Sequence, residues 1–172
     1  MQSKFKIIKL LIIIISFFIF LIFLYQRFFW SFFVRDGQLV ELVLKDNFFS
    51  FQGQSILVEL VKDGRSIKKG LSNRDQLQTV SGQEIDGMLF VFPLAKIQQF
   101  WMKDMKFDID ICWLDRHVLL DCTRQASRPV FEEDEDQLAI YQSPQAVDMV
   151  LETAPGLLTE EWFGAKFYRN LF

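Results

Sequence analysis

The sequence is poor in the side chains that bind zinc or build disulfide networks. Its 172 residues include two cysteines, Cys112 and Cys122, and a single histidine, His117. A structural zinc site needs about four Cys or His ligands, and a disulfide-dense scaffold needs more than one pair of cysteines. We therefore expect neither, and no metal or other cofactor. Whether Cys112 and Cys122 form a disulfide stays open, because the register of a hairpin decides whether their side chains lie opposite each other.

Motifs of common enzyme classes are also missing. The chain has no Gly-x-Ser-x-Gly, no phosphate-binding Gly-x-x-x-x-Gly-Lys-Ser/Thr and no Gly-x-Gly-x-x-Gly. A Ser-His-Asp or Cys-His arrangement would have to use His117, which follows Asp115 and Arg116 in a turn-like segment. These absences favour a non-enzymatic function without deciding the question, and we predict no catalytic residue.

Acidic residues are absent from the first 34 positions. Four of the 19 basic residues precede position 35 and all 22 acidic residues follow it, which leaves 15 basic against 22 acidic residues in the remainder. A domain this acidic, without a basic stripe, is a poor candidate for nucleic-acid binding. The same charge repels an anionic membrane surface.

One long apolar run occupies the N-terminal region. Ile7–Tyr25 is 19 residues long and is interrupted only by Lys9 and Ser16; as a helix it would measure about 28 Å, close to the hydrocarbon core of a bilayer. A cleavable signal peptide would end in small residues, whereas Gln-Arg-Phe-Phe-Trp follows here. A core helix apolar on all sides would need a much larger protein around it. We predict a single-pass signal anchor within residues 1–34, which has the lipid bilayer as its partner.

The flanking charges predict the orientation of this anchor. Lys4, Lys6 and Lys9 precede the run, and Arg27 and Arg35 follow it. By the positive-inside rule the N-terminal lysines favour a cytoplasmic N-terminus, and the two arginines weaken that preference. We expect the protein in the cytoplasmic (inner) membrane, with its domain outside the cytoplasm.

The remaining sequence predicts many short strands. Residues 35–54 look like a connector with a possible first strand at Gln38–Leu44, and residues 55–172 form the domain. Apolar runs bounded by turn residues recur along it, and Arg65–Leu77 holds a short helical pattern. We predict a mainly-β (α+β) domain: a small, compact, antiparallel barrel or sandwich with one or two short helices.

The segment from Phe107 to Leu114 alternates apolar and polar residues. This period of two is typical of a half-buried strand, with Asp108 and Asp110 on its wet face. Paired carboxylates, together with Asp104, could instead bind Mg²⁺ or Ca²⁺. The regular alternation favours the strand. The acidic run at residues 132–136 lacks the spacing of a calcium loop and indicates a solvated loop.

The preceding segment, Phe100–Lys103, breaks that alternation. Three large apolar residues in a row cannot all face one side of a plain strand, so Trp101 is free to line a shallow pocket beside the ammonium of Lys103. The alternative is core packing with contacts between methionine and tryptophan. Arg74 follows the helical pattern and suits either an anion or a buried carboxylate such as Asp110 or Asp86.

Several segments taken together are similar to a known family. "GLSNRDQL", "DGMLFVFP", "QFWMKDMKFDIDICWLD" and "YQSPQAVDMVLETAPG" occur in the order typical of domain of unknown function 192 (DUF192). The resemblance covers about residues 55–172 and implies a compact mainly-β domain, often secreted or membrane-anchored, without an established activity. The residues that match its pattern are Gly70, Leu71, Arg74, Gly87, Met88, Phe90, Phe92, Phe100, Trp101, Met102, Lys103, Asp110, Tyr141, Ser143 and Glu152. The chain departs from the pattern at Asp104, Met105 and Asp108.

Three functional hypotheses follow. The first is an anchored domain that binds a small ligand near Arg74, Trp101, Lys103, Asp110 and Tyr141. The second is an interaction module of a membrane protein complex, which would need an exposed apolar patch. The third is a metal-dependent hydrolase, which would need the three aspartates to converge on one ion. We favour the first.

Overall fold

The computed structural model describes residues 9–21, 35–45, 53–129 and 138–169. The chain divides into two units, Met1–Val34 and Arg35–Phe172. In the first unit, residues 9–21 form an α-helix whose apolar side chains are exposed. Within the described ranges no helix has both the length and the apolar character needed to cross a bilayer. Both ends of the predicted anchor, residues 7–8 and 22–25, lie outside these ranges, as does the acidic run at 132–136.

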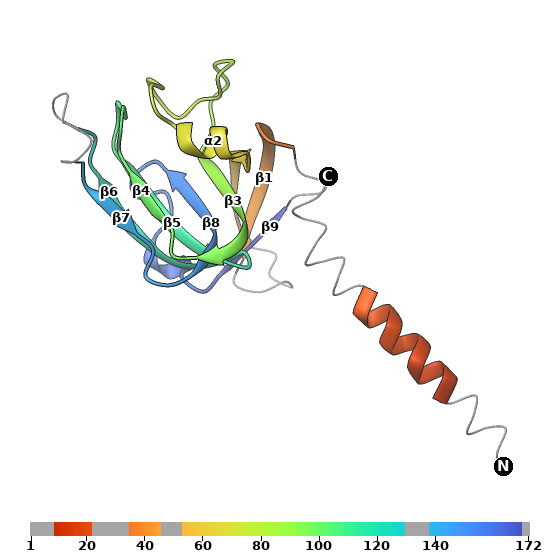
Figure 1. Ribbon diagram of the computed structural model, residues 1–172. Coiled ribbons are helices and arrows are strands. Elements are labelled where there is room, and N and C mark those ends of the chain that lie inside the picture. Colours follow the sequence, from red (N-terminus) through yellow and green to blue (C-terminus); the bar gives the residue numbers. More distant parts are fainter. Residues whose placement is uncertain (1–8, 22–34, 46–52, 130–137, 170–172) are drawn as a thin grey trace, which may run out of the picture. The chain divides into compact units, whose positions relative to one another are not determined.

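The second unit is a closed β-barrel with a small additional sheet (Figure 1). Around the barrel the strands follow the order β1-β2-β3-β8-β5-β6-β9, and β4 pairs with β7 in the second sheet. The elements are β1 (Gln38–Lys45), β2 (Gln54–Val61), α2 (Gly64–Lys69), β3 (Gly87–Lys96), β4 (Gln99–Trp101), β5 (Ile109–Asp115), β6 (Val118–Ala126), β7 (Ile140–Gln142), β8 (Val147–Thr153), the 3-10 helix η2 (Glu160–Trp162) and β9 (Lys166–Arg169). The mainly-β prediction is confirmed, and of its two alternatives the structure has the barrel.

The predicted antiparallel arrangement is wrong for one pair of strands. β2 and β3 run parallel, with Val58 opposite Gly87 and Val61 opposite Phe90. The chain between them includes α2 and leads back to the end of the barrel at which β2 begins. β3 can therefore run in the same direction as β2. The close approach at Gly87 needs glycine, because a Cβ there would lie 2.4 Å from the carbonyl oxygen of Glu152.

The register identifies the two faces of the barrel wall. On β1 the side chains of Val40, Leu42 and Leu44 are buried and alternate with more exposed ones, so these three face the barrel interior. Val40 and Leu42 pair with Val58 and Ile56, so these residues of β2 also face the interior and Glu59 faces outward. Glu59 pairs with Met88, Met88 with Glu152, and Glu152 with Ile111, so these four form a row on the outer face of the wall. Two acidic residues therefore share the outer face of the wall with apolar ones.

A buried cluster covers that outer face. Strands β3, β5 and β8 contribute one side of it, and α2, the segment after it, β4 and β7 pack over the other side through Ile67, Phe100 and Tyr141. Its buried members are Val61, Leu71, Met88, Phe90, Met102, Met105, Ile109, Ile111, Trp113, Ala126, Val147 and Val150. The barrel wall in this region is therefore buried on both faces.

Burial on both faces overturns the prediction for β5. Ile109 to Leu114 are all buried, including Asp110, which has no exposed surface; Asp108 is exposed and precedes the strand. β5 lies between β6 and β8, so one of its faces lines the barrel and the other lies under the outer cluster. Alternation in sequence indicates a half-buried strand only where one face meets water.

The hairpin of β5 and β6 contains the disulfide that the sequence left open. The chain turns at Arg116 and His117, both with positive φ, and the register places Cys112 directly opposite Cys122. The two residues form a disulfide bond. It links two neighbouring barrel strands in the protein interior.

Candidate functional site

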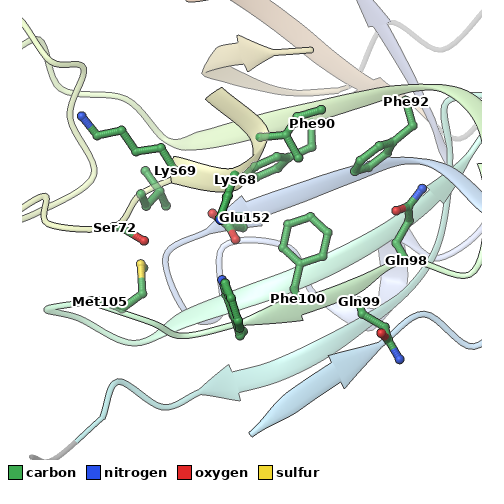
Figure 2. Close-up of a pocket in the computed structure, with 14 residues that line it drawn as sticks. Lys68, Lys69, Ser72, Phe90, Phe92, Gln98, Gln99, Phe100, Met105 and Glu152 are labelled. Carbon is green, nitrogen blue, oxygen red and sulfur yellow. The ribbon is translucent and has the colours of Figure 1, made fainter. Parts of the chain in front are cut away.

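A cavity of about 230 Å³ opens between the outer face of the barrel, α2 and β4 (Figure 2). Strands β3 and β8 form one wall, and the β4 segment forms another. Its lining combines aromatic rings with a few polar groups: Ile67, Lys68, Lys69, Gly70, Leu71, Ser72, Phe90, Phe92, Gln98, Gln99, Phe100, Trp101, Met105 and Glu152.

Glu152 is the only carboxylate among these lining residues. It is 5% exposed, and its Oε2 atom has no hydrogen-bond partner among the described residues. Burial raises the pKa of this carboxyl to about 8, while the positive charge of Arg74 acts in the opposite direction. At neutral pH the group is therefore mostly a neutral acid, held in an apolar site without a partner at Oε2.

Arg74 is bound mainly to a different carboxylate. Its Nη1 and Nη2 groups donate to Glu59 at 2.6 and 3.2 Å, and Nη1 also donates to the carbonyl of Gln78. Both side chains of this ion pair are about 10% exposed or less. The predicted partners of Arg74, Asp110 and Asp86, bind elsewhere: Asp86 accepts from the backbone of Leu57.

Gly70 brings the backbone close to Glu152. It ends α2 with a φ of 48°, a left-handed conformation that glycine adopts readily. A Cβ at this position would lie 3.3 Å from the ring of Phe90 and 3.9 Å from Oε2 of Glu152. The absence of a side chain at Gly70 therefore keeps open the space beside the carboxyl group.

Aromatic rings form the apolar part of the cavity. Phe100 packs edge-to-face against Phe90 and Phe92, with ring centroids 5.0 and 6.5 Å apart. Trp101, the next residue on β4, is half-buried and also lines the cavity. The Lys103 ammonium lies 5.8 Å from the centroid of the Trp101 ring, in a cation–π contact.

Polar side chains lie on two sides of the cavity. Figure 2 draws Lys68 and Lys69 on α2, Ser72 just after it, and Gln98 and Gln99 on the opposite side. Ser72 is engaged, since its hydroxyl donates to the carbonyl of Lys103 at 2.8 Å. The cavity therefore has a buried acid inside, aromatic walls, and exposed lysines near its opening.

A family model matches residues 48–162 of the chain. The protein belongs to the DUF192 family. The description of that family is "Uncharacterized ACR", so membership brings no activity with it. All the residues that line the cavity fall within the matched segment. No curated protein matches this DUF192 chain.

Two crystal structures share its fold. A "putative transcription regulator" from Sinorhizobium meliloti 1021 is 22% identical, with a TM-score of 0.60, and the match covers 79% of this chain and 97% of the other. A protein of unknown function from Novosphingobium aromaticivorans DSM 12444 is 21% identical, with a TM-score of 0.58 and coverage of 76% and 85%. At this identity the similarity shows the fold alone.

The structure does not bring the five predicted site residues of the DUF192 chain together in one cavity. Trp101 lines it. Lys103 lies over the Trp101 ring, Tyr141 is paired with Phe100 across the small sheet, and Arg74 is bound to Glu59. The fifth residue, Asp110, lines a different depression, which α2 and β4 do not border.

Asp110 links several parts of the backbone. Its carboxylate accepts hydrogen bonds from Arg124 Nη1 at 2.8 Å, from the backbone N–H of Gln125 at 2.8 Å and from that of Gly156 at 2.9 Å. A carboxylate with this many donors is satisfied within the protein. Asp108, meanwhile, accepts from the backbone N–H of Arg128. Among the described residues no group of three His, Cys, Asp or Glu side chains is placed to hold a metal ion.

Sequence reasoning missed Glu152 as a site residue. In the sequence Glu152 stands out only as a match to the family pattern, although a carboxylate inside the apolar run Val147–Thr153 is itself a signal. On a buried strand a charged side chain needs a partner or a function. The register, which places Glu152 on the cavity face beside Met88, was needed to choose between them.

Proposed function

We propose that this DUF192 protein is a membrane-anchored domain, located outside the cytoplasm, that binds a small ligand in the cavity beside Glu152. The observation that supports ligand binding most directly is the Oε2 atom of Glu152, which is buried, lines the cavity and has no hydrogen-bond partner among the described residues. A buried polar group left without a partner costs about 1–3 kcal/mol. Each such group in a native protein requires an explanation, and a bound partner that satisfies it is one.

The shape and lining of the cavity limit the ligand. Aromatic and apolar walls with a few polar groups are typical of small-molecule sites. The volume of about 230 Å³ is below the range of roughly 300–1,000 Å³ for drug-sized ligands. The ligand is therefore a compact molecule, of the size of a single ring with one polar group.

Thermal unfolding of the full-length chain in detergent tests this proposal. A panel of amines, alcohols, sugars, amino acids, nucleotides and divalent metals is added to the wild type, to Trp101→Ala and to Trp162→Ala. Trp162 is the matched control, because it is also half-buried but lies in η2, away from the cavity. A ligand at about 100 times its dissociation constant stabilises the folded state by about 2.7 kcal/mol. The proposal requires a stabilisation that Trp101→Ala removes and Trp162→Ala retains; equal behaviour of the two variants contradicts it.

The apolar run Ile7–Tyr25 supports the anchor, and the Cys112–Cys122 disulfide supports the location, because disulfides persist in oxidising compartments. Alkylation of cysteines in intact cells tests both together. Membrane fractions should contain the full-length chain with both thiols blocked as a disulfide. Free, alkylatable thiols in the native cell would contradict a location outside the cytoplasm.

The other two hypotheses receive less support. The large apolar side chains exposed on the described part of the barrel unit are Val80, Leu94, Ile97 and Ile140. They are spread over several segments, and scattered apolar residues are ordinary on protein surfaces. For a hydrolase, Asp110 would have to leave three hydrogen bonds to reach a metal.

A further inference from the structure

We propose that the ligand is an organic monocation: one ammonium group on a small apolar body, with the ammonium bound to Glu152 and the apolar body against the aromatic walls. This inference rests on the proposed ligand-binding function and names the chemistry of the ligand. Its first support is the charge balance of the buried groups around Glu152.

That balance is incomplete within the described residues. Arg74 and Glu59 neutralise each other through two hydrogen bonds. Glu152, the second acid on this face, has no comparable basic partner, and its Oε2 atom is left without a hydrogen bond. An ionised Glu152 would therefore add one uncompensated negative charge to a buried site. A bound ammonium supplies both the missing positive charge and a donor for Oε2.

The aromatic walls favour the same class of ligand. The faces of Phe and Trp rings attract cations through their quadrupoles, and Phe90, Phe92, Phe100 and Trp101 all line the cavity. Trp101 already has a cation near its ring, the ammonium of Lys103 at 5.8 Å. A neutral sugar or alcohol would gain a hydrogen bond from Glu152 but no comparable attraction from the rings.

The lysines near the opening restrict the ligand to one positive charge. Apart from Glu152, the charged residues that line the cavity are Lys68 and Lys69 on α2. Both are exposed, so water screens them from the interior. A second ammonium that extends to the opening would lie near these two side chains and be repelled, and a monoamine should therefore bind more tightly than a diamine of similar shape.

Binding should be coupled to the loss of a proton. In the free protein the carboxyl of Glu152 has a pKa of about 8, whereas the ammonium binds its ionised form. Below that pKa the ionised fraction falls about tenfold per pH unit, and the apparent affinity falls with it. Affinity for the ammonium should therefore rise from pH 6 to pH 8 and then level off until the amine loses its own proton.

Calorimetric titration of the full-length chain in detergent, corrected for empty micelles, tests the inference. The matched probes are benzylamine and benzyl alcohol, which differ in one polar group, and 4-methylbenzylamine and p-xylylenediamine, which differ by one amine. The matched variants are Glu152→Gln and Asp148→Asn, since Asp148 lies on the same strand but does not line the cavity. At pH 8 we expect benzylamine to bind the wild type at least about tenfold more tightly than benzyl alcohol. Glu152→Gln should remove this preference, and Asp148→Asn should retain it. In the wild type p-xylylenediamine should bind more weakly than 4-methylbenzylamine.

The failures of the two proposals differ. If benzyl alcohol binds as tightly as benzylamine at every pH, and both bindings need Trp101, the ligand class is wrong and the ligand-binding function stands. If benzylamine binds Glu152→Gln as tightly as the wild type, Glu152 is not the partner and the inference is overturned. If no probe binds and no compound stabilises the chain in the thermal panel, both proposals fail.

Discussion

Arg74 binds Glu59 through two terminal nitrogens, at 2.6 and 3.2 Å, in a site where both side chains are almost fully buried. This pair joins the segment after α2 to strand β2 and so holds one side of the cavity in place. It also leaves the Nε of Arg74 without a hydrogen-bond partner among the described residues. The pair is structural, and the charge of Arg74 by itself lowers the pKa of Glu152, against the larger effect of burial.

Removal of Arg74 should therefore destabilise the fold. Arg74→Ala leaves Glu59 buried without its partner, and breaking a buried ion pair costs about 3–5 kcal/mol. Chemical denaturation of the full-length chain measures this cost. Lys106→Ala is the control, because the Lys106–Asp75 pair lies at the surface, with side chains 51% and 78% exposed, and surface pairs contribute little. Equal losses in the two variants would contradict the structural role of Arg74.

The stability of the protein should depend on pH through Glu152. The carboxyl has an ordinary value of 4.5 and a pKa of about 8 when folded. Between these values the folded state retains a proton that the unfolded state has lost, so the free energy of unfolding falls as pH rises, by about 1.4 kcal/mol per unit from this group.

The comparison of wild type with Glu152→Gln isolates that contribution. The variant cannot titrate, so its stability should exceed that of the wild type by a margin that grows from pH 5 to pH 8 and is constant above. Denaturant unfolding at each pH gives the margin. A difference that does not change with pH would show that the carboxyl keeps an ordinary pKa in the folded protein.

Asp110 should matter for stability and not for ligand binding. Asp110→Asn weakens the bonds to Arg124 and to two backbone N–H groups, and we expect a loss of about 2–4 kcal/mol, since hydrogen bonds to charged groups contribute about 1.5–3 kcal/mol each. Asp108→Asn, an exposed site two residues away with one backbone hydrogen bond, should lose much less. Any fraction of Asp110→Asn that stays folded should bind amines as the wild type does. If the folded variant binds amines more weakly, Asp110 contributes to ligand binding and this prediction is wrong.

The disulfide should stabilise the barrel measurably. Cys112 and Cys122 are ten residues apart, and closing a loop of this size in the unfolded chain stabilises the folded state by about 3 kcal/mol. A reducing agent should lower the denaturation midpoint of the wild type. The Cys112→Ala/Cys122→Ala variant should already unfold at the lower midpoint and not respond to reductant. A wild type that does not respond either would show that the bond is not formed in solution.

Short-range patterns predicted the elements of this fold better than their arrangement. The turn at Arg116 and His117 and the strands on either side of it follow from local residue types. The helix after residue 63 does so only in part, because it ends at Lys69 whereas the helical pattern continues to Leu77. The parallel pairing of β2 with β3 and the double burial of β5 do not, because both depend on which distant segment covers which face. β3 continues past Pro93 to Lys96, because the register shifts between Val91 and Lys96 and a proline is tolerated at such an irregularity.

The residues that line the cavity could be predicted only in part, for the same reason. Trp101 stands out because three large apolar residues in a row cannot share one face of a strand, and the structure has Trp101 in the cavity lining; its role in binding stays a prediction. Glu152 and Arg74 acquire their roles from pairing and burial. Glu152 lies opposite Met88 and Arg74 binds Glu59, and neither neighbour is adjacent in sequence. Only the folded structure therefore shows that the carboxylate of Glu59 has a basic partner and that Oε2 of Glu152 has no hydrogen bond among the described residues.

Binding of a small organic ammonium ion in the cavity beside Glu152 can be tested directly by NMR of ¹³C-methyl-labelled methionines in the full-length chain. Met105 lines the cavity. Met149 is buried on β8, on the face opposite to that of Glu152, and serves as the internal control. On titration with benzylamine at pH 8 we expect a saturable shift of the Met105 methyl signal, with Met149 unchanged. A Met105 signal that does not move, or a Met149 signal that moves as much, would contradict it.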